Sequence, residues 1–222
     1  MFDFRVVPAG DAALLVEWPP RIDVETSSRV VSMAGAIRAR YGARVRDVVV
    51  GYCSVTVYYD PLETDPAALE ADLRLIATSP PPASSGPSAV VRIPVRYGGE
   101  EGPDLADVAA FAGCTPADIV ARHSSTTFRV FVVGFVPGFP YMYPLSGAER
   151  WLDIPRRATP RTRVPAGSVA IAMGQTGIYP METPGGWHVI GRTDAKPYDP
   201  DRRDRPFLLQ PGDQVRFDVA RA

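Results

Sequence analysis

The stretch that decides the fold reads GFVPGFPYMYPL at residues 134–145 and IPRRATPRTRVPAGSVAIAMGQTGIYPMETPGGWHVIGRTD at residues 154–194. Short β-like runs alternate there with loops rich in Gly, Pro, Arg and aromatic residues. Pro fixes φ and removes a donor, whereas Gly permits positive φ and close backbone approach. Such a segment indicates strands joined by rigid loops that shape a surface for a small ligand or a partner's substrate.

The chain from residue 127 onward reads as all β. Strands are predicted at 128–133, 169–172, 188–190 and 215–219, with a turn at Gln210–Asp213. Many short strands with Pro/Gly turns predict a closed or nearly closed β-barrel.

Two helices and one strand precede the barrel strands. A strand is predicted at 90–97 and a short helix at 104–112. A second helix begins at Thr115, which suits the N-cap, with Pro116 at N1 and Asp118 at N3, and runs to about residue 122.

The first 80 residues predict a β-β-α-β-β-α domain, with two helices on one face of a small sheet. Strands are predicted at 2–7, 14–18, 48–50 and 55–59, and helices at 23–41 and from Asp65-Pro66 onward. The segment 78–88, TSPPPASSGPS, has the composition of a linker. The predicted fold is therefore an α+β domain at 1–80 followed by a mainly-β barrel domain at 89–222.

Composition narrows the function classes. The chain has 222 residues, 45% hydrophobic and 22% charged, with a net charge of −1, which does not suggest a nucleic-acid binder. Cys53 and Cys114 are the only cysteines, and no metal-ligand spacing is present, so disulfides and a metal site are not expected. There is no apolar run of about 20 residues and no signal peptide, so we expect a cytoplasmic protein without a membrane partner.

Arginines gather in one proline-stiffened loop. Arg156, Arg157, Arg161 and Arg163 fall within eight residues, and guanidinium groups suit bidentate contacts to carboxylate or phosphate. The alternative is a solvated loop with internal ion pairs.

Three further segments are candidates for ligand contact. The turn predicted at 174–177 would offer backbone N–H groups for an anion, with Gln175 and Thr176 as added donors, or serve as a hairpin turn alone. Residues 184–187 read as a similar tight turn, with Trp187 filling the barrel as the alternative. The segment 134–139 would place its phenylalanines in a pocket wall or in a barrel plug.

His123 and His188 are the only histidines. His123 is the best general acid–base candidate by its near-neutral pKa, with capping or packing at a helix end as the alternative. No nucleophile elbow, phosphate-binding loop or carboxylate cluster is present. The chain therefore does not read as a complete hydrolase or ATPase, which points to chemistry shared with a partner.

The chain resembles the family of the 5-oxoprolinase B subunit, also called allophanate hydrolase subunit 1 and the kinase-A inhibitor family. The motifs that carry this resemblance are HSS at 123–125, GFVPGFPYM at 134–142, PRRATPRTRVPAGSVAIA at 155–172, QTGIYPMETPGGWHVIGRT at 175–193 and LLQPGDQVRF at 208–217. The resemblance implies that the second domain is a cyclophilin-like barrel. It also implies a partner of the 5-oxoprolinase C-subunit type or the allophanate hydrolase subunit 2 type and, in the 5-oxoprolinase system, a third protein of the A-subunit type.

The implied reaction converts 5-oxoproline to glutamate with ATP hydrolysis, so the substrate is a small anionic amide. ATP with Mg would be used by the assembled complex, and no cofactor is expected on this chain itself. By position, the resemblance makes Phe135, Pro137 and Phe139 a pocket wall and Arg156, Arg161 and Arg163 anion binders. Gln175, Thr176, Gly185 and Gly186 become substrate-facing contacts.

The sequence departs from the family pattern at two places. Tyr143-Pro144-Leu145 stands where relatives often have a glycine pair, and His188 stands where Gln is common. Two other activities stay open: a component of allophanate or urea metabolism, and an inhibitor of a sensor histidine kinase. Prolyl isomerase activity is not expected, because a shared barrel does not transfer function.

Overall fold

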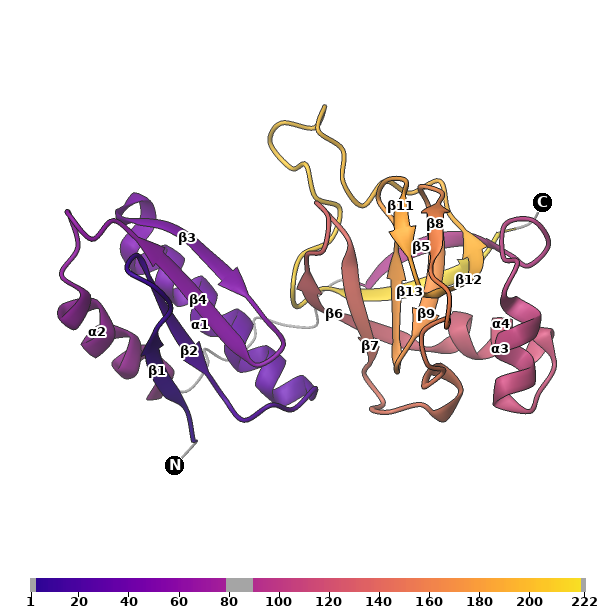
Figure 1. The fold of residues 1–222 in the computed structure, drawn as a ribbon, viewed down its shortest axis with the longest axis horizontal. Helices are drawn as coiled ribbons and strands as arrows, with labels where there is room; N and C mark the ends of the chain where they lie inside the picture. The colour runs from indigo at the N-terminus through magenta and orange to yellow at the C-terminus, as the bar shows by residue number, and fades with distance from the viewer. Residues whose placement is uncertain (1–2, 79–89, 221–222) are drawn as a thin grey trace. The chain divides into compact units, whose positions relative to one another are not determined.

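The computed structural model describes residues 3–78 and 90–220 (Figure 1). The chain divides into two compact units, Met1–Pro87 and Ser88–Ala222. Apart from Thr78, the predicted linker at 78–88 lies outside the described residues. No helix among the described residues has both the length and the apolar character needed to cross a bilayer.

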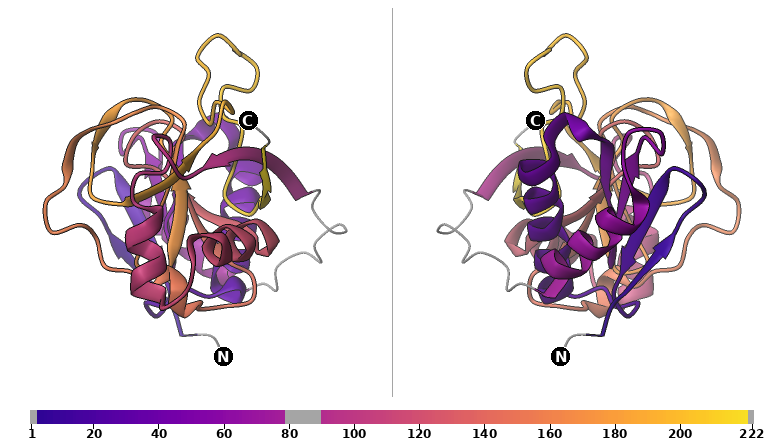
Figure 2. Two further views of the ribbon diagram at one scale, coloured as in Figure 1. Left: turned by 90° about the vertical axis from the view of Figure 1, so that its right-hand side faces the viewer. Right: turned by 90° about the vertical axis from the view of Figure 1, so that its left-hand side faces the viewer.

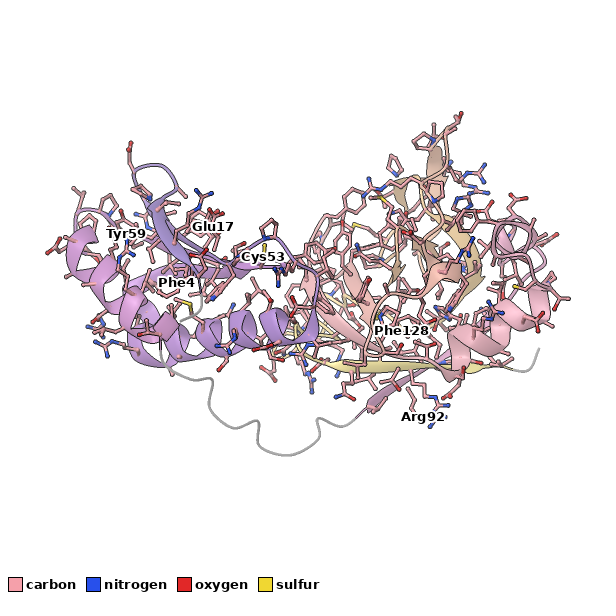
Figure 3. The ribbon with its side chains drawn as sticks, turned by 90° about the horizontal axis from the view of Figure 1, so that it is seen from below. Phe4, Glu17, Cys53, Tyr59, Arg92 and Phe128 are labelled. Carbon is pink, nitrogen blue, oxygen red and sulfur yellow. The ribbon has the colours of Figure 1, made fainter. Side chains whose placement is uncertain are left out.

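The first unit is a four-stranded antiparallel sheet in the order β1-β2-β4-β3. Its two helices lie on one face of the sheet, as predicted (Figure 3). The elements are β1 (Arg5–Pro8), β2 (Ala13–Glu17), α1 (Val24–Tyr41), the 3-10 turn η1 (Gly42–Arg44), β3 (Val45–Val50), β4 (Ser54–Tyr59) and α2 (Pro66–Thr78).

Both helices begin where the sequence predicts. The Asp23 side chain accepts from the Thr26 N–H at 2.8 Å, which satisfies one donor of the first turn of α1. Apolar residues three and four apart then place Val30 and Ile37 at 0% exposure against the sheet. Leu73 of α2 is equally buried in the same core.

In the second unit, seven of the described strands close a barrel in the order β10-β7-β6-β13-β5-β12-β9, which confirms the predicted architecture. A separate two-stranded ribbon pairs β11 with β8. The strands are β5 (Val90–Tyr97), β6 (Thr127–Val133), β7 (Pro140–Pro144), β8 (Arg161–Val164), β9 (Ser168–Ala172), β10 (Gln175–Ile178), β11 (Thr183–Gly185), β12 (His188–Arg192) and β13 (Gln214–Val219).

All seven barrel strands contribute side chains to one interior core, including Phe128, Met142 and Phe217. Two helices, α3 (Leu105–Ala112) and α4 (Pro116–Ser125), lie together beside the barrel and add to that core (Figure 1). The 3-10 turn η2 (Arg150–Leu152) joins them there. The capping box predicted at Thr115 and Asp118 is present, and α4 continues three residues beyond the predicted end.

The connection between β12 and β13 contains a loop that projects from the barrel (Figures 1 and 2). A bridge between Tyr198 and Phe207 closes its base, and their rings lie 5.3 Å apart. Gly138 supports this base, because a Cβ there would lie 2.6 Å from the Tyr198 Cβ. The projecting loop therefore packs against the Gly134–Phe139 segment.

Candidate functional site

Strand β9 separates two different environments. Val169 and Ile171 point into the barrel core, whereas Ala170 and Ala172 belong to a second cluster on the outer face. Small residues on that face leave room for rings: a Cβ on Gly177 of β10 would lie 2.6 Å from the Phe139 ring. The alternation of large and small residues in SVAIAMGQTG thus leaves a surface of small residues on the outer face, on which aromatic side chains pack.

Four aromatic rings meet edge to face on this surface of small residues. Phe139 lies 4.8 Å from Tyr141, 5.1 Å from Tyr179 and 5.5 Å from Trp187, measured between ring centroids. Phe135 adds a fifth ring at 5.9 Å from Phe139. These distances and T-shaped angles are those of favourable aromatic pairs. We call these five residues, together with Arg156, the aromatic–arginine site.

Two phenol groups give the site its polar character. Burial raises the pKa of Tyr141, and the positive charge of Arg156 partly opposes this rise. Burial also raises the pKa of Tyr179, against the hydrogen bond of the Trp187 backbone N–H to its oxygen. Both phenols therefore remain protonated at neutral pH and act as hydrogen-bond donors.

The arginines of the loop have different partners. Arg161 and Arg157 both bind the Asp104 carboxylate, which is 2% exposed, with N–O distances of 2.6 to 2.7 Å. Arg163 pairs with Glu182 on the surface. Arg156 forms none of the ion pairs among the described residues, so its exposed guanidinium is the one available to a ligand.

Asp104 holds the loop to the barrel. It also accepts from the Val189 backbone N–H at 2.7 Å, next to Trp187. Burial by itself raises the pKa of Asp104, but the hydrogen bonds from Arg161 and Val189 and the nearby guanidinium charges outweigh it, so the net pKa is lowered. The carboxylate is therefore charged and shared among three donors.

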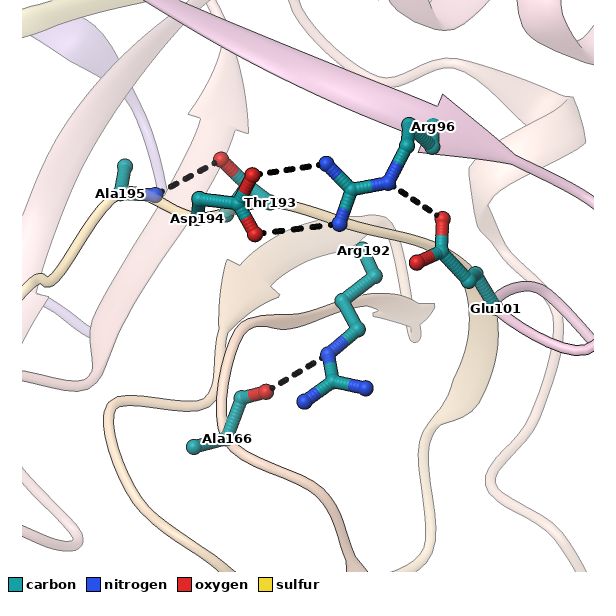
Figure 4. A network of polar contacts seen from close by, with 7 residues as sticks. All are labelled: Arg96, Glu101, Ala166, Arg192, Thr193, Asp194 and Ala195. Atoms are coloured by element: carbon teal, nitrogen blue, oxygen red, sulfur yellow. Dashed lines mark hydrogen bonds and ion pairs between the residues drawn. The ribbon is translucent and has the colours of Figure 1, made fainter. Parts of the chain in front are cut away.

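Figure 4 shows a second network, in which Arg96 and Arg192 hold the chain around Thr193 and Asp194. Arg96 of β5 binds Glu101 at 2.7 Å and Asp194 at 2.8 Å. Arg192 donates to the Ala166 carbonyl at 3.1 Å and so holds the loop before β9. In that loop the Gly167 N–H donates to the Tyr179 carbonyl at 2.7 Å.

Gly167 itself has φ of +80°, and a Cβ there would lie 2.3 Å from the Thr193 carbonyl oxygen. Only glycine fits this position, so the VPAGS motif has a structural reason.

The segment 134–139 presents its side chains in two ways. Phe139 is 2% exposed within the outer cluster, and Pro137 is exposed. Phe135 is 63% exposed and has φ of 68°, a left-handed conformation that is strained for an aromatic residue. Phe139 thus forms the buried floor of the aromatic–arginine site, and the exposed Phe135 side chain projects at its edge.

The turn predicted at 174–177 lies instead at residues 173–174, where it is the hairpin turn of the alternative. Met173 and Gly174 form the hairpin turn, both with positive φ, and Gln175–Ile178 is strand β10. The N–H groups of Met173 and Gly174 already donate to the Ile154 and Leu152 carbonyls at 2.8 and 2.9 Å. They are therefore not an anion nest.

His123 and Thr176 lie in the barrel core, away from the outer face. The Tyr97 hydroxyl contacts His123 Nδ1 at 2.7 Å, and Nε2 contacts the Thr176 hydroxyl at 2.9 Å. Thr176 donates in turn to the Ala170 carbonyl at 3.2 Å, so the neutral imidazole completes a chain of hydrogen bonds. Its ring also stacks on Phe217 at 4.4 Å.

Burial lowers the pKa of His123 to about 3, and the side chain is 0% exposed. This position contradicts the acid–base role predicted for His123 and supports the packing alternative. Thr176 likewise cannot face a substrate, because its hydroxyl is enclosed with the imidazole.

The predicted glycine and glutamine contacts adjoin the site. Residues 183–185 are strand β11 rather than part of a turn, and Gly185 lies against Tyr179. The Gly186 carbonyl accepts from the Arg157 N–H at 2.8 Å, beside Arg156. Gln175 pairs with Ala172 on the outer face.

Tyr141 and Tyr179 were not identified as site residues from the sequence. For Trp187 the sequence left two roles open, in a turn that contacts ligand or in filling the barrel. Their positions depend on the face that each side chain takes within β7, directly after β10 and directly before β12. The regular spacing of small residues in β9 was the one available signal.

Depressions in the surface also lie elsewhere in the chain. The first unit has two neighbouring depressions of about 410 and 720 Å³ that share Asp3, Trp18 and Pro19. Their charges pair locally, as Arg5 does with Glu17. Among the described residues, no three His, Cys, Asp or Glu side chains gather to hold a metal ion.

Residues 4–209 match the family described as carboxyltransferase domain, subdomain C and D. The chain belongs to this family. It is 39% identical over 221 residues to a family member from Haemophilus influenzae that is named as the B subunit of 5-oxoprolinase, covering 97% of both chains. It is 41% identical over 209 residues to the protein of the same name from Escherichia coli O157:H7, covering 94% of this chain and 92% of that one.

Solved structures show the same fold. The structure of TTHA0988 superposes with a TM-score of 0.81 at 37% identity, over 95% of this chain. This chain spans only 40% of the length of that one. The urea amidolyase of K. lactis has a TM-score of 0.75 over 98% of this chain, at 20% identity, and supports the fold alone.

Proposed function

We propose that the chain is one subunit of a 5-oxoprolinase-type hydrolase, which opens 5-oxoproline to glutamate with hydrolysis of ATP. The observation that carries this proposal is the identity of 39–41% to two proteins named as 5-oxoprolinase B subunits, over at least 92% of each chain. In the reaction the ring amide C–N bond breaks, and water supplies the new carboxylate oxygen and the amine proton.

The site supports this assignment chemically. 5-Oxoproline carries a carboxylate beside a small apolar ring, and ring opening creates further anionic oxygens. Arg156 offers charge, Tyr141 and Tyr179 offer neutral donors, and the rings of Phe135 and Trp187 offer apolar surface. None of the six residues of the site is an activated nucleophile or a charged base, so we assign the site to binding and orientation rather than to bond making.

The chain does not act alone in this proposal. A partner of the 5-oxoprolinase C-subunit type or the allophanate hydrolase subunit 2 type, and a protein of the A-subunit type, complete the enzyme, and Mg-ATP is used by the assembly. The sequence has no phosphate-binding loop of the P-loop type, which agrees with nucleotide chemistry on a partner.

A role in urea or allophanate metabolism is the second candidate. A putative urea carboxylase from Emericella nidulans is 28% identical over 124 residues, but the match covers 52% of this chain. Urea amidolyase from Lachancea kluyveri is 33% identical over 115 residues. Because these matches cover only about half of this chain, they support a urea-related role less well than the nearly full-length matches support the 5-oxoprolinase assignment.

The test is glutamate formation from 5-oxoproline and ATP by this chain with its partner subunits. A parallel mixture omits this chain, and others replace 5-oxoproline with allophanate or urea. Glutamate that depends on this chain supports the proposal. Turnover of allophanate alone would replace it with the second candidate.

A further inference from the structure

The Tyr179 hydroxyl is held against the backbone that precedes Trp187. A Cβ on Gly185 would lie 2.2 Å from this hydroxyl and 2.8 Å from the Cζ atom, so the phenol fits only because residue 185 has no side chain. The Trp187 N–H hydrogen-bonds to the phenol oxygen. Since the oxygen accepts there, the hydroxyl proton is directed elsewhere.

Arg156 lies beside the same segment, because a Cβ on the next residue, Gly186, would lie 3.9 Å from the Arg156 Cβ. Arg156 and Arg161 both act electrostatically on Tyr179. Arg161 is bound to Asp104 by two hydrogen bonds of 2.7 Å, so its charge is largely compensated. Arg156 is exposed and lies outside the ion pairs of the described residues. An anion beside Tyr179 would therefore meet one uncompensated guanidinium.

Other aromatic rings pack beside Tyr179 on the outer face of the barrel. Tyr141 contacts Trp187 at 5.8 Å and Phe139 at 4.8 Å, and it also acts electrostatically on Tyr179. Phe135 projects beside this floor in a strained conformation. Strain in an exposed aromatic residue is typical of positions kept for ligand contact. The apolar edge suits a small ring next to the anionic group.

We propose that Tyr179 is a ligand-binding residue, which donates its hydroxyl proton to an anionic oxygen that Arg156 also binds. The ligand class is a small lactam or amide that carries a carboxylate, and Phe135 contacts its apolar part. Naming the lactam rests on the proposed function; the pairing of Tyr179 with Arg156 rests on the contacts that the two residues make with the neighbouring Gly185 and Gly186 and on their electrostatic interaction. This assigns substrate recognition to a tyrosine whose side chain is nearly fully buried.

The first experiment measures binding to the full chain without partner subunits. The indole N–H signal of Trp187 is followed by ¹H–¹⁵N NMR during titration with 5-oxoproline and, separately, with 2-pyrrolidinone, which lacks the carboxylate. We expect a saturable shift with 5-oxoproline and none with 2-pyrrolidinone. Tyr179→Phe and Arg156→Gln should each weaken binding by about 10- to 100-fold, as expected for a lost hydrogen bond to a charged group.

The matched control is Tyr198→Phe, which removes a phenol oxygen from the base of the projecting loop. It should bind like the unaltered chain. Tyr179→Phe binding as tightly as this control would overturn the proposal, and so would 5-oxoproline leaving the Trp187 signal unmoved in both the isolated chain and the assembly.

The second experiment separates this proposal from the proposed function. In the assembled enzyme, Tyr179→Phe should raise KM for 5-oxoproline at least about 10-fold with an unchanged melting temperature. An inactive unaltered assembly whose Trp187 signal still responds to 5-oxoproline through Tyr179 would reject the enzyme assignment and keep the binding site. An active assembly with normal KM for Tyr179→Phe would do the reverse.

Discussion

Arg161 binds Asp104 through two parallel hydrogen bonds, Nη1 to Oδ2 and Nη2 to Oδ1, each 2.7 Å long. Asp104 is the N-cap residue of α3, yet its carboxylate does not cap the helix. It turns to Arg157, Arg161 and the Val189 N–H instead. One buried carboxylate thereby joins helix, arginine loop and strand β12 next to the aromatic–arginine site.

Replacing Asp104 by Asn should destabilise the second unit by about 3 kcal/mol, because two guanidinium groups lose their buried counter-charge. Denaturant unfolding of the full chain measures this loss. Asp107→Asn on the exposed face of the same helix is the matched control, with an expected change within about 0.5 kcal/mol. Equal stability of the two variants would show that the network contributes little.

Gly185 and Gly186 should respond differently to alanine. A Cβ at Gly185 would lie 2.2 Å from the Tyr179 hydroxyl, whereas at Gly186 the nearest atoms are 3.7 Å away. Gly185→Ala should therefore cost about 2 kcal/mol through overpacking and displace Tyr179, whereas Gly186→Ala should be tolerated. Thermal unfolding and the Trp187 indole signal report both effects. Comparable behaviour of the two variants would contradict the close approach.

Phe135 and Phe139 make a second contrasting pair. Phe135→Gly should leave the free energy of unfolding unchanged or raise it by about 1 kcal/mol, since it relieves the left-handed strain at φ 68°. Phe139→Ala should lower it by about 3–5 kcal/mol, because the ring is buried. Denaturant unfolding checks both values.

Despite its stability, Phe135→Gly should bind 5-oxoproline more weakly than the unaltered chain. A variant that loses stability and keeps binding would show that Phe135 packs rather than contacts ligand.

Periodicity and capping signals predicted the elements well, because they act over a few residues. The stripe from Val30 to Ile37 and the capping box at Thr115 each determine a helix without reference to the rest of the chain. The barrel also followed from the spacing of short strands and Pro/Gly turns.

The site was harder to predict because it depends on partners far apart in sequence. Arg161 reads as a free anion binder until Asp104, 57 residues away, is placed beside it. Tyr179 gains its role from Gly185 and Trp187, which meet it only after the strands pair. His123 was a candidate for acid–base catalysis because the imidazole has a near-neutral intrinsic pKa. The sequence does not reveal that this side chain is buried.

His123 should make the folded protein sensitive to mild acid. Burial lowers its pKa from 6.5 to about 3, so between these pH values the unfolded chain binds a proton that the folded chain does not. Stability due to this group is therefore fully present above pH 6.5 and falls as the pH drops, by at most about 1.4 kcal/mol per pH unit.

Unfolding by denaturant at about pH 7 and about pH 5 should differ by about 2 kcal/mol more in the unaltered chain than in His123→Gln, which lacks the titrating group. His188→Gln is the control for the other histidine. An imidazole that titrates freely as an acid–base catalyst would give no such difference, and that outcome would restore His123 as a candidate for the chemistry.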